Sequence, residues 1–424
     1  MIKIFNCFTE KDKKKLELFL ENRRSIDLKN VKKVNKIIED IKRNKLKALL
    51  RYEKKFSKNK ELKPSKAKIK NSIKKLNPKV KKAIDFAYER IVKFHAAQLK
   101  TLKDVKYIDK YKNKMEYKTI PIESVGIYVP GNLPSTLLMN SVPAKLAKVK
   151  RIILATPKVN GKLNPGVLYA AKKVGIKDIY SIGGAQAIAS LAFIYNVNKI
   201  VGPGNKYVAE AKRQLSGKIV GTESMFAGPS EICVLADSLS NVDQVAKSLI
   251  SQAEHDVDSQ CILITKNKNL IKRVQDKISE LIKILPRKKI AYTSLKKHGL
   301  IINVKNDKQI IDVVNMISTE HLELLVKNYK KYLGKITNAG SICNGKYSPM
   351  CVSDFTVGTN HVLPTSGSAK FSSGLNISEF VKKISIVTLN KFGVEKIANP
   401  AITLSEFENL EGHSQSIKSR LRRN

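Results

Sequence analysis

From about residue 120 onward, the sequence alternates short β-branched runs with glycine-containing turns and helical patterns. The runs occupy residues 151–155, 179–182, 199–201, 232–236 and 261–265. Alternating strands and helices at this spacing predict an α/β fold built on parallel sheets. Ligands of such sheets collect beyond the carboxyl ends of the strands. The glycine turns at 183–184 and 202–204 fall there, so we expect a binding site beside them.

The rest of the chain has a mainly helical pattern. Residues 1–24 predict a short helical arm, and residues 25–120 predict amphipathic helices with breaks near Pro64 and Pro78. Helical patterns return after about residue 375. Hydrophobic residues make up 42% of the 424, enough for two or three cores, which excludes an intrinsically disordered chain. No apolar run approaches the ~20 residues of a membrane-spanning helix, so we expect a soluble protein.

The formal net charge of +44 raises the question of nucleic-acid binding. The excess is uneven, because residues 1–120 carry a net +24 and residues 121–265 only +5. The lysines are spread along amphipathic stretches such as 31–50, which is typical of solvated helix faces. No zinc-finger spacing, RNA-recognition aromatic motif or basic region with heptads accompanies them. A lysine-rich nucleic-acid-binding protein is therefore a secondary hypothesis, and we expect no specific nucleic-acid or membrane partner.

The five cysteines form no C-x-x-C pair and no closely spaced framework. Reduced thiols are therefore expected, and a catalytic or metal-binding role for Cys343 and Cys351 is the less favoured alternative. At the N-terminus, apolar residues precede the first lysine run, the reverse of a secretory signal. Both features predict a cytoplasmic protein.

The sequence has no G-x-G-x-x-G motif, so a nucleotide site would need to bind the phosphates through another group of residues. The turns at 183–186 and 202–205 could each open a helix whose N-terminal amides face an anion. Taken singly, a plain strand-to-helix turn is the simpler interpretation of either one.

A possible metal site combines two pairs of residues. Gln252 and His255 are three residues apart on an expected helix and therefore share a face. Asp354 and His413 offer two further donors in turn-rich segments. Nitrogen, neutral oxygen and carboxylate donors together suit zinc, or a neighbouring divalent metal, acting as a Lewis acid. The alternative for Gln252 and His255 is a polar helix face near solvent.

Two pairs of titratable residues could carry proton chemistry. Glu320 and His321 are adjacent and provide two proton acceptors, which suits a reaction that removes protons at two stages. Glu408 and His413 are five residues apart, and Gly412 could break the helix between them and bring both to one site. The alternatives are a surface pair and a helix end with an exposed histidine.

Together these segments resemble the histidinol dehydrogenase family from about residue 120 to the C-terminus. The matching strings, in the family's order and with nearly its spacing, are GIYVPG, LLMNSVPAK, GGAQAIA, GPGNKYVAEAKRQ, AGPSEI, SQAEHDVDSQ, TEHLE, SDFTVGTNHVLPT and ENLEGH. Several strings in order are far more specific than any single motif.

The resemblance implies an NAD-dependent, zinc-containing oxidoreductase that converts L-histidinol to L-histidine through L-histidinaldehyde, the last step of histidine biosynthesis. It implies that Glu320 activates the water that attacks the aldehyde, and that His321 is the base for the substrate hydroxyl and the hydrated aldehyde. The other implied residues are the zinc ligands Gln252, His255, Asp354 and His413, which also contact substrate, the NAD contacts Tyr128, Gln186 and Asn205, and the substrate contacts Ser230, His321 and Glu408. His361 is a further expected contact. Another zinc-assisted NAD-linked amino-alcohol dehydrogenase is the competing enzyme.

The resemblance also implies two incomplete Rossmann-like domains and a homodimer with shared active sites and one zinc ion per subunit. The expected division is a helical arm at 1–24, a discontinuous first α/β domain at 25–127 and 231–375, a second Rossmann-like domain at 128–230, and a helical tail at 376–424. On that pattern the tail crosses to the partner and carries Glu408 and His413 to its site.

Three departures from the family pattern concern loops. Segment 130–135 is shorter than the family's glycine-rich loop, Ser224 stands where the family commonly has Asp, and the string SDF at 353–355 replaces GDY. None of them removes an implied ligand or catalytic residue.

Overall fold

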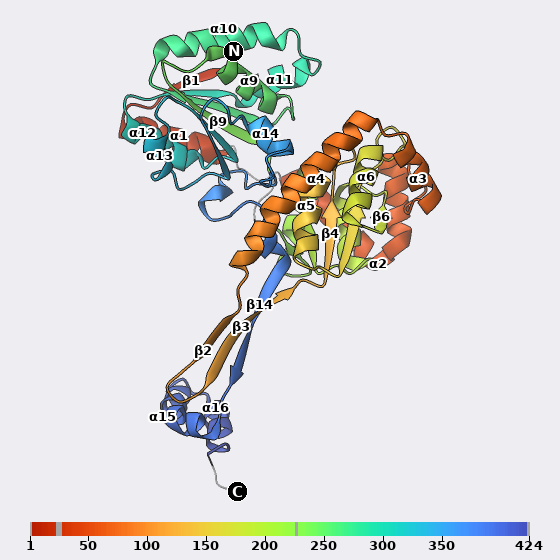
Figure 1. The fold of residues 1–424 in the computed structure, drawn as a ribbon, viewed down its shortest axis with the longest axis vertical. Coiled ribbons are helices and arrows are strands. Elements are labelled where there is room, and N and C mark those ends of the chain that lie inside the picture. Colours follow the sequence, from red (N-terminus) through yellow and green to blue (C-terminus); the bar gives the residue numbers. More distant parts are fainter. Residues whose placement is uncertain (1, 23–27, 225–227, 422–424) are drawn as a thin grey trace.

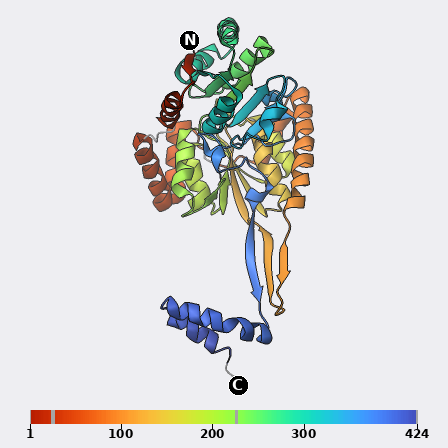
Figure 2. The ribbon, with the colours of Figure 1, turned by 90° about the vertical axis from the view of Figure 1, so that its left-hand side faces the viewer.

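The computed structural model describes residues 2–22, 28–224 and 228–421. Two α/β bodies lie side by side, and a narrow β arm projects from them with two helices at its far end (Figures 1 and 2). The two bodies contain a six-stranded and a five-stranded sheet, and the arm contains a three-stranded sheet. The α/β class predicted from the sequence is therefore confirmed.

The six-stranded sheet is parallel throughout. Its strands, in spatial order, are β1 (Lys3–Asn6), β11 (Leu300–Asn303), β10 (Gln260–Thr265), β9 (Glu231–Ala236), β12 (His321–Leu325) and β13 (Ser341–Asn344). Along β9, Ile232 and Val234 face one hydrophobic cluster while Cys233 and Leu235 face another, because side chains alternate between the faces of a strand. The first cluster includes residues of α9 (Val242–Ala253), α10 (Lys268–Ile282) and α11 (Lys288–His298), and the second includes residues of α1 (Glu10–Asn22), α12 (Asp307–Ile317) and α13 (Lys330–Leu333).

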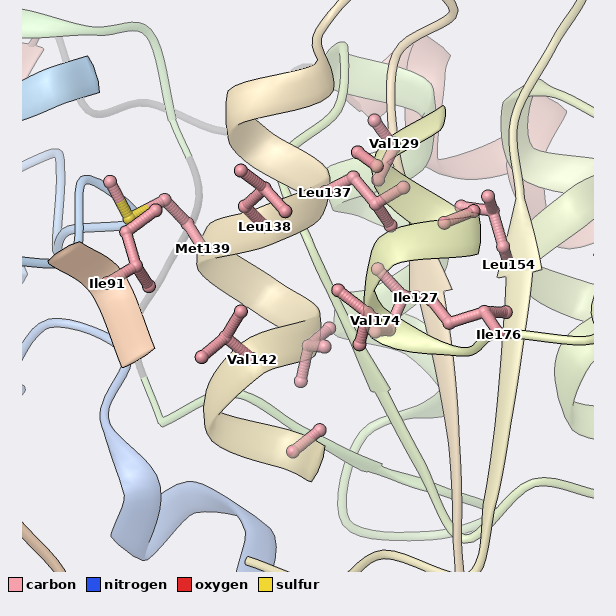
Figure 3. Packing of buried hydrophobic residues seen from close by; sticks show 14 of the residues in the cluster. Ile91, Ile127, Val129, Leu137, Leu138, Met139, Val142, Leu154, Val174 and Ile176 are labelled. Carbon is pink, nitrogen blue, oxygen red and sulfur yellow. The ribbon is translucent and has the colours of Figure 1, made fainter. Parts of the chain in front are cut away.

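The five-stranded sheet is also parallel and also buried on both faces. Its order is β6 (Asp178–Tyr180), β5 (Arg151–Ala155), β4 (Ser124–Tyr128), β7 (Lys199–Val201) and β8 (Gly221–Thr222). On one face α5 (Pro134–Leu146) and α6 (Pro165–Val174) pack with α4 (Pro78–Gln98), and Figure 3 shows Leu137, Leu138 and Met139 of α5 between Ile91 and the strands. On the other face lie α7 (Gly184–Phe193), α8 (Lys206–Leu215) and α2 (Leu28–Ser57).

The structure differs from the expected domain division in the N-terminal part of the chain. Residues 25–127 were grouped with 231–375, but α2 and α4 pack on the five-stranded sheet, and α3 (Lys66–Lys74) packs on α6. The reason is that the apolar stripe of α2, including Val34 and Leu49, is buried against α7 and α8. Residues 1–24 are likewise not only helical, because β1 forms an edge of the six-stranded sheet. Residues 1 and 23–27 lie outside the described part of the chain.

The arm consists of three antiparallel strands that continue out of the five-stranded body. Their order is β14 (Val381–Thr388), β3 (Lys114–Pro121) and β2 (Val105–Ile108). The helices α15 (Lys391–Phe407) and α16 (Glu411–Lys418) pack on each other at its tip, on the opposite side from both bodies (Figures 1 and 2). The expected tail, 376–424, thus begins with a strand, and residues 422–424 are not described.

The remaining short elements lie in the loops. They are the 3₁₀ turns η1 (Leu99–Thr101), η2 (Ser368–Lys370) and η3 (Ile377–Phe380), and the helix α14 (Met350–Phe355). None of the helices in the described ranges has both the length and the apolar character needed to cross a membrane.

We predict that Leu49→Ala lowers the free energy of unfolding by about 2–5 kcal/mol, because it leaves a cavity between α2 and α7. Leu50→Ala is the matched control, since Leu50 is the next residue of the same helix and is 39% exposed, whereas Leu49 is 0% exposed. Urea unfolding of both variants measures the difference. Equal effects would contradict the packing of α2 on the five-stranded body.

Candidate active site

Glu320 and His321 lie at the amino end of β12, beside the amino end of β9. α12 is capped by Ser318, whose left-handed conformation (φ 52°) turns the chain toward the strand. Glu320 Oε2 accepts a hydrogen bond from the backbone N–H of Glu231, the first residue of β9, at 2.8 Å. Glu320 and His321 are 7% and 4% exposed. The sequence predicted ligands at carboxyl strand ends, and this pair lies at the opposite edge of its sheet.

The imidazole of His321 is held close to two carboxylates. Its Nε2 atom lies 3.7 Å from Asp354 Oδ1 and 3.9 Å from Glu320 Oε1. Burial, together with the nearby His361 and His255, lowers the pKa of His321 to about 3. The ring is therefore neutral at physiological pH and can accept a proton.

Glu320 is the second proton acceptor of the site. Burial raises the pKa of its carboxyl well above the usual range, and the charges of Glu231 and Asp354 raise it further, while the hydrogen bond from the Glu231 N–H opposes them. A carboxylate whose pKa is raised by burial is a stronger proton acceptor than a free glutamate.

Three of the four expected metal ligands lie on neighbouring elements of the single chain. Gln252 lies in the last turn of α9, His255 follows that helix at the protein surface, and Asp354 lies on α14, which packs on α9. Gln252 Oε1 and Asp354 Oδ1 are buried and accept no hydrogen bond. Burial, with the charge of Glu323, raises the pKa of Asp354 to about 7. Two buried oxygens without donors are costly unless a cation binds there, so these residues fit a metal ion.

The fourth expected ligand, His413, lies elsewhere. It is exposed on α16, at the tip of the arm and far from both bodies (Figure 1). Glu408 is exposed at the end of α15, and the break between the helices comes at Asn409 (φ 59°), whereas Gly412 lies inside α16. Within the described residues, no group of three or more His, Cys, Asp or Glu side chains is arranged to hold a metal.

The expected nucleotide contacts lie at the carboxyl edge of the five-stranded sheet, as predicted for these turns. Tyr128 ends β4, and its hydroxyl accepts a hydrogen bond from the backbone N–H of Gly184 at 3.3 Å. Asn205 caps α8, where its Oδ1 atom accepts from the N–H groups of Tyr207 and Val208 at 3.0 and 3.2 Å. The first amides of α8 are therefore satisfied by the protein itself.

The turn before α7 is bound by a residue that the sequence analysis missed. Glu53 of α2 is fully buried, and its Oε1 atom accepts hydrogen bonds from the backbone N–H of Gly183 and from Gln186 Nε2, both at 2.9 Å. Nothing in the lysine-rich sequence around Glu53 signals this contact, because 130 residues separate it from Gly183. A carboxylate of the chain thus lies beside the start of α7, where a bound anion was expected.

Residues 360–361 connect the two bodies next to the catalytic pair. The Nδ1 atom of His361 donates to the carbonyl oxygen of Asp354 at 2.6 Å, which leaves Nε2 facing the hydroxyl of Thr136 on α5 at 3.2 Å. Burial and the nearby His255 lower the pKa of His361 to about 4, against the effect of the bond to Asp354. His361 therefore links α5 of the five-stranded body to Asp354, whose carboxylate lies near His321.

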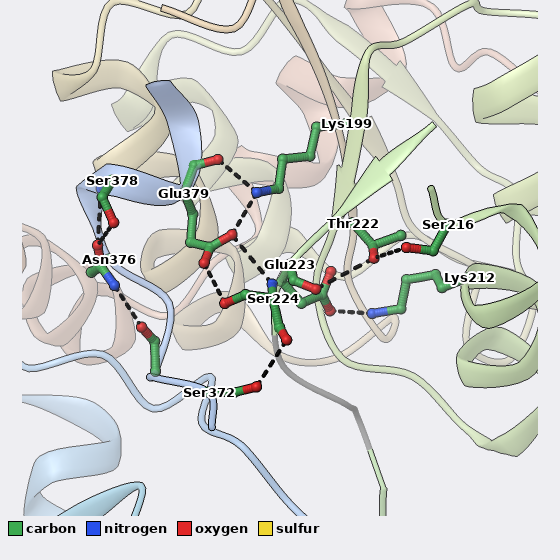
Figure 4. A network of polar contacts seen from close by, with 11 residues as sticks. Lys199, Lys212, Ser216, Thr222, Glu223, Ser224, Ser372, Asn376, Ser378 and Glu379 are labelled. Carbon is green, nitrogen blue, oxygen red and sulfur yellow. Dashed lines mark hydrogen bonds and ion pairs between the residues drawn. The ribbon is translucent and has the colours of Figure 1, made fainter. Parts of the chain in front are cut away.

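The segment before β9 is anchored to the base of the arm. The hydroxyl and the backbone N–H of Ser224 donate to the carboxylate of Glu379, which also pairs with Lys199 (Figure 4). An aspartate at 224, as in the family pattern, would repel Glu379, so Glu379 accounts for the serine. Ser230 is half-buried directly before β9. The AGPSEI string begins at Ala227, which lies outside the described residues.

Comparisons with known proteins agree with this geometry. The sequence matches the histidinol dehydrogenase family over residues 21–421. It is 51% identical to histidinol dehydrogenase of Pelagibacter ubique, with all of both chains covered, and 41% identical to that of Caldanaerobacter subterraneus subsp. tengcongensis, with 99% of both covered. The crystal structure of histidinol dehydrogenase from Elizabethkingia anophelis superposes with a TM-score of 0.88 at 35% identity, covering 99% of this chain and 98% of the other. The chain therefore belongs to the histidinol dehydrogenase family.

Proposed function

We propose that the protein oxidises L-histidinol to L-histidine in two NAD-linked steps through L-histidinaldehyde, the last reaction of histidine biosynthesis. The observation that carries this proposal is the buried pair Glu320 and His321 beside the unpartnered oxygens of Gln252 and Asp354. Two proton acceptors suit a reaction that oxidises one carbon twice, because each oxidation removes a proton. The nearby oxygens of Gln252 and Asp354 could bind a cation that holds the substrate.

The proposed zinc ligands are Gln252, His255 and Asp354 of one subunit and His413 of its partner. A bound zinc ion supplies a positive charge that holds and orients the imidazole and amino nitrogens of the substrate. The same four residues then lie next to the substrate, together with Ser230, which precedes β9, and Glu408. His361 is a further proposed contact, because it lies beside Asp354.

In the first oxidation, His321 accepts the proton of the substrate hydroxyl while the carbon gives a hydride to NAD. In the second, Glu320 accepts a proton from the water that attacks the aldehyde carbon. His321 then takes the proton of the hydrated aldehyde as a second hydride leaves. His321 is available as the proton acceptor in both steps because its ring is neutral at physiological pH.

The proposed cofactor contacts are Tyr128, Gln186 and Asn205. Support comes from their place at the carboxyl edge of the five-stranded sheet, where parallel sheets bind ligands. The contact between Thr136 and His361 brings this edge up to the catalytic pair, as hydride transfer requires. NAD receives the hydride in each step.

We further propose a homodimer in which the arm of one subunit completes the site of the other. An arm that stands away from its own body leaves many apolar side chains exposed. These are Val105, Tyr107, Ile108, Tyr117, Val387, Leu404 and Phe407, all more than half exposed. A partner subunit would cover them and receive Glu408 and His413. We also propose a cytoplasmic location, which fits the five free cysteines.

We predict that the protein forms two NADH per L-histidinol, and that chelation of the metal abolishes both oxidations. Zinc analysis should show one ion per subunit, and adding zinc back should restore the rate. A zinc-bound protein inert toward histidinol but active on another amino alcohol would favour the competing dehydrogenase.

Glu320→Gln should slow aldehyde oxidation by roughly 10²–10⁴-fold, because the amide cannot accept the proton of water. Alcohol oxidation should fall much less, since His321 is retained. Stopped-flow assays started from histidinol and from histidinaldehyde measure the two steps on the same variant. His321→Asn is the comparison variant and should slow both. Equal losses in both steps of Glu320→Gln would reject this division of roles.

Mixing subunits tests the shared site. His255→Ala and His413→Ala homodimers should both be inactive, whereas their heterodimer has one site with both substitutions and one intact site, and should recover up to about half of the activity. Two different affinity tags allow the heterodimer to be purified and verified. No recovery in verified heterodimers would mean that each chain builds its own site.

A further inference from the structure

Glu53 connects α2 to the start of α7 at the proposed cofactor edge. One carboxylate oxygen, Oε1, accepts both the Gly183 N–H and the Gln186 side-chain N–H at 2.9 Å. Glu53 is 0% exposed and Gln186 is 3% exposed, so water does not compete for these bonds. Burial raises the pKa of Glu53, and the bonds from Gly183 and Gln186 oppose that effect.

The segment that follows Glu53 fixes the same turn from a second side. The side chain of Asn59 donates to the carbonyl oxygen of Ser181 at 2.5 Å and accepts from Lys158 at 2.8 Å. The backbone N–H of Asn59 in turn bonds the carbonyl of Glu53 at 3.1 Å. The turn between β6 and α7 is therefore clamped by the end of α2, and Glu53 has little freedom to move away from Gln186.

This arrangement determines which way the amide of Gln186 faces. Because Glu53 Oε1 can only accept, the nitrogen of Gln186 must point toward it. The oxygen of Gln186 then lies over Gly184, where a Cβ would stand 2.8 Å from it. Within the described residues this oxygen accepts no hydrogen bond. Gly184 has no Cβ to block this oxygen, and its positive φ of 66° is a conformation that glycine adopts readily.

We propose that Glu53 is a positioning residue that holds Gln186 with its carbonyl oxygen toward the cofactor. Gln186 then binds a donor group of the dinucleotide, namely a ribose hydroxyl, the nicotinamide carboxamide N–H or the adenine amino group. It does not bind a phosphate, because an amide oxygen repels an anion and the Glu53 carboxylate lies beside the start of α7. The proposal rests on the proposed role of Gln186 as an NAD contact.

The test compares Glu53→Met with Glu53→Gln in the zinc-loaded enzyme. Methionine keeps the length of the side chain but removes the acceptor, so the KM for NAD and the Kd for NADH should rise on the order of tenfold. Glutamine keeps an acceptor oxygen in place of Oε1, so it should retain both constants within about threefold. The KM for histidinol should change little in either variant. An unchanged Kd for NADH in Glu53→Met, or an equal loss in Glu53→Gln, overturns the proposal.

A control variant separates positioning from simple destabilisation. Glu210→Met removes another largely buried carboxylate of the same body, which bonds Arg213 and Gln214 and does not touch the turn. It should lower thermal stability without changing NADH binding. If Glu53→Met does not fold, Glu53→Ala and Glu53→Gln provide the same comparison by NADH titration.

A double-mutant cycle tests whether Glu53 acts through Gln186. Adding Glu53→Met to Gln186→Leu should weaken NADH binding no further, and additive losses would overturn the proposal. Cofactor analogues identify the donor group that Gln186 binds. If Glu53→Met no longer weakens binding of 3-acetylpyridine adenine dinucleotide, the donor is the carboxamide, and if it no longer weakens binding of nicotinamide hypoxanthine dinucleotide, the donor is the adenine amino group. If Glu53→Met weakens binding of both analogues, the donor is a ribose hydroxyl. A wild-type protein that binds NADH but does not oxidise histidinol would contradict the proposed function while leaving this inference standing.

Discussion

The burial of titratable groups without full partners is the constraint on which the site depends. Glu320 and Asp354 each lie within 4 Å of His321 Nε2, and Asp354 and His321 each keep a buried polar atom without a hydrogen bond. Such burial costs free energy, which the packed six-stranded sheet must offset. In the proposed function, a bound cation and a polar substrate would offset this cost.

The two bodies meet through opposite edges of their sheets. The catalytic pair stands at the amino ends of β9 and β12, whereas the proposed cofactor contacts stand at the carboxyl ends of the five-stranded sheet. Residues 360–361 bridge them, because His361 touches both Asp354 and Thr136. In the proposed function, this arrangement would put the proton acceptors on one sheet and the cofactor contacts on the other.

At the proposed cofactor edge, Asn205 caps the N-terminus of α8, and Glu53 bonds Gly183 directly before α7. In the usual dinucleotide fold, the helix amides themselves hold the pyrophosphate. Here the edge offers an amide oxygen and a phenol instead, which agrees with the absence of a G-x-G-x-x-G motif. The projecting arm also carries exposed apolar side chains, and its helix α16, which bears His413, lies away from both bodies.

Local patterns determined much of the fold and the identity of the site residues. The predicted runs at 151–155 and 199–201 are strands with those bounds, because a β-branched apolar run bounded by turns has one low-energy place in a parallel sheet. The expectation that Gln252, His255 and Asp354 form a metal site came from the family resemblance, since the motifs carry what spacing alone does not, and it stays a prediction. The tertiary structure alone decided that α2 and α4 cover the five-stranded sheet, that Glu320 and His321 lie at amino strand ends, and that Glu53 reaches Gly183. These are contacts between segments far apart in sequence, and their energy comes from burial and hydrogen bonds that form only once the chain has packed.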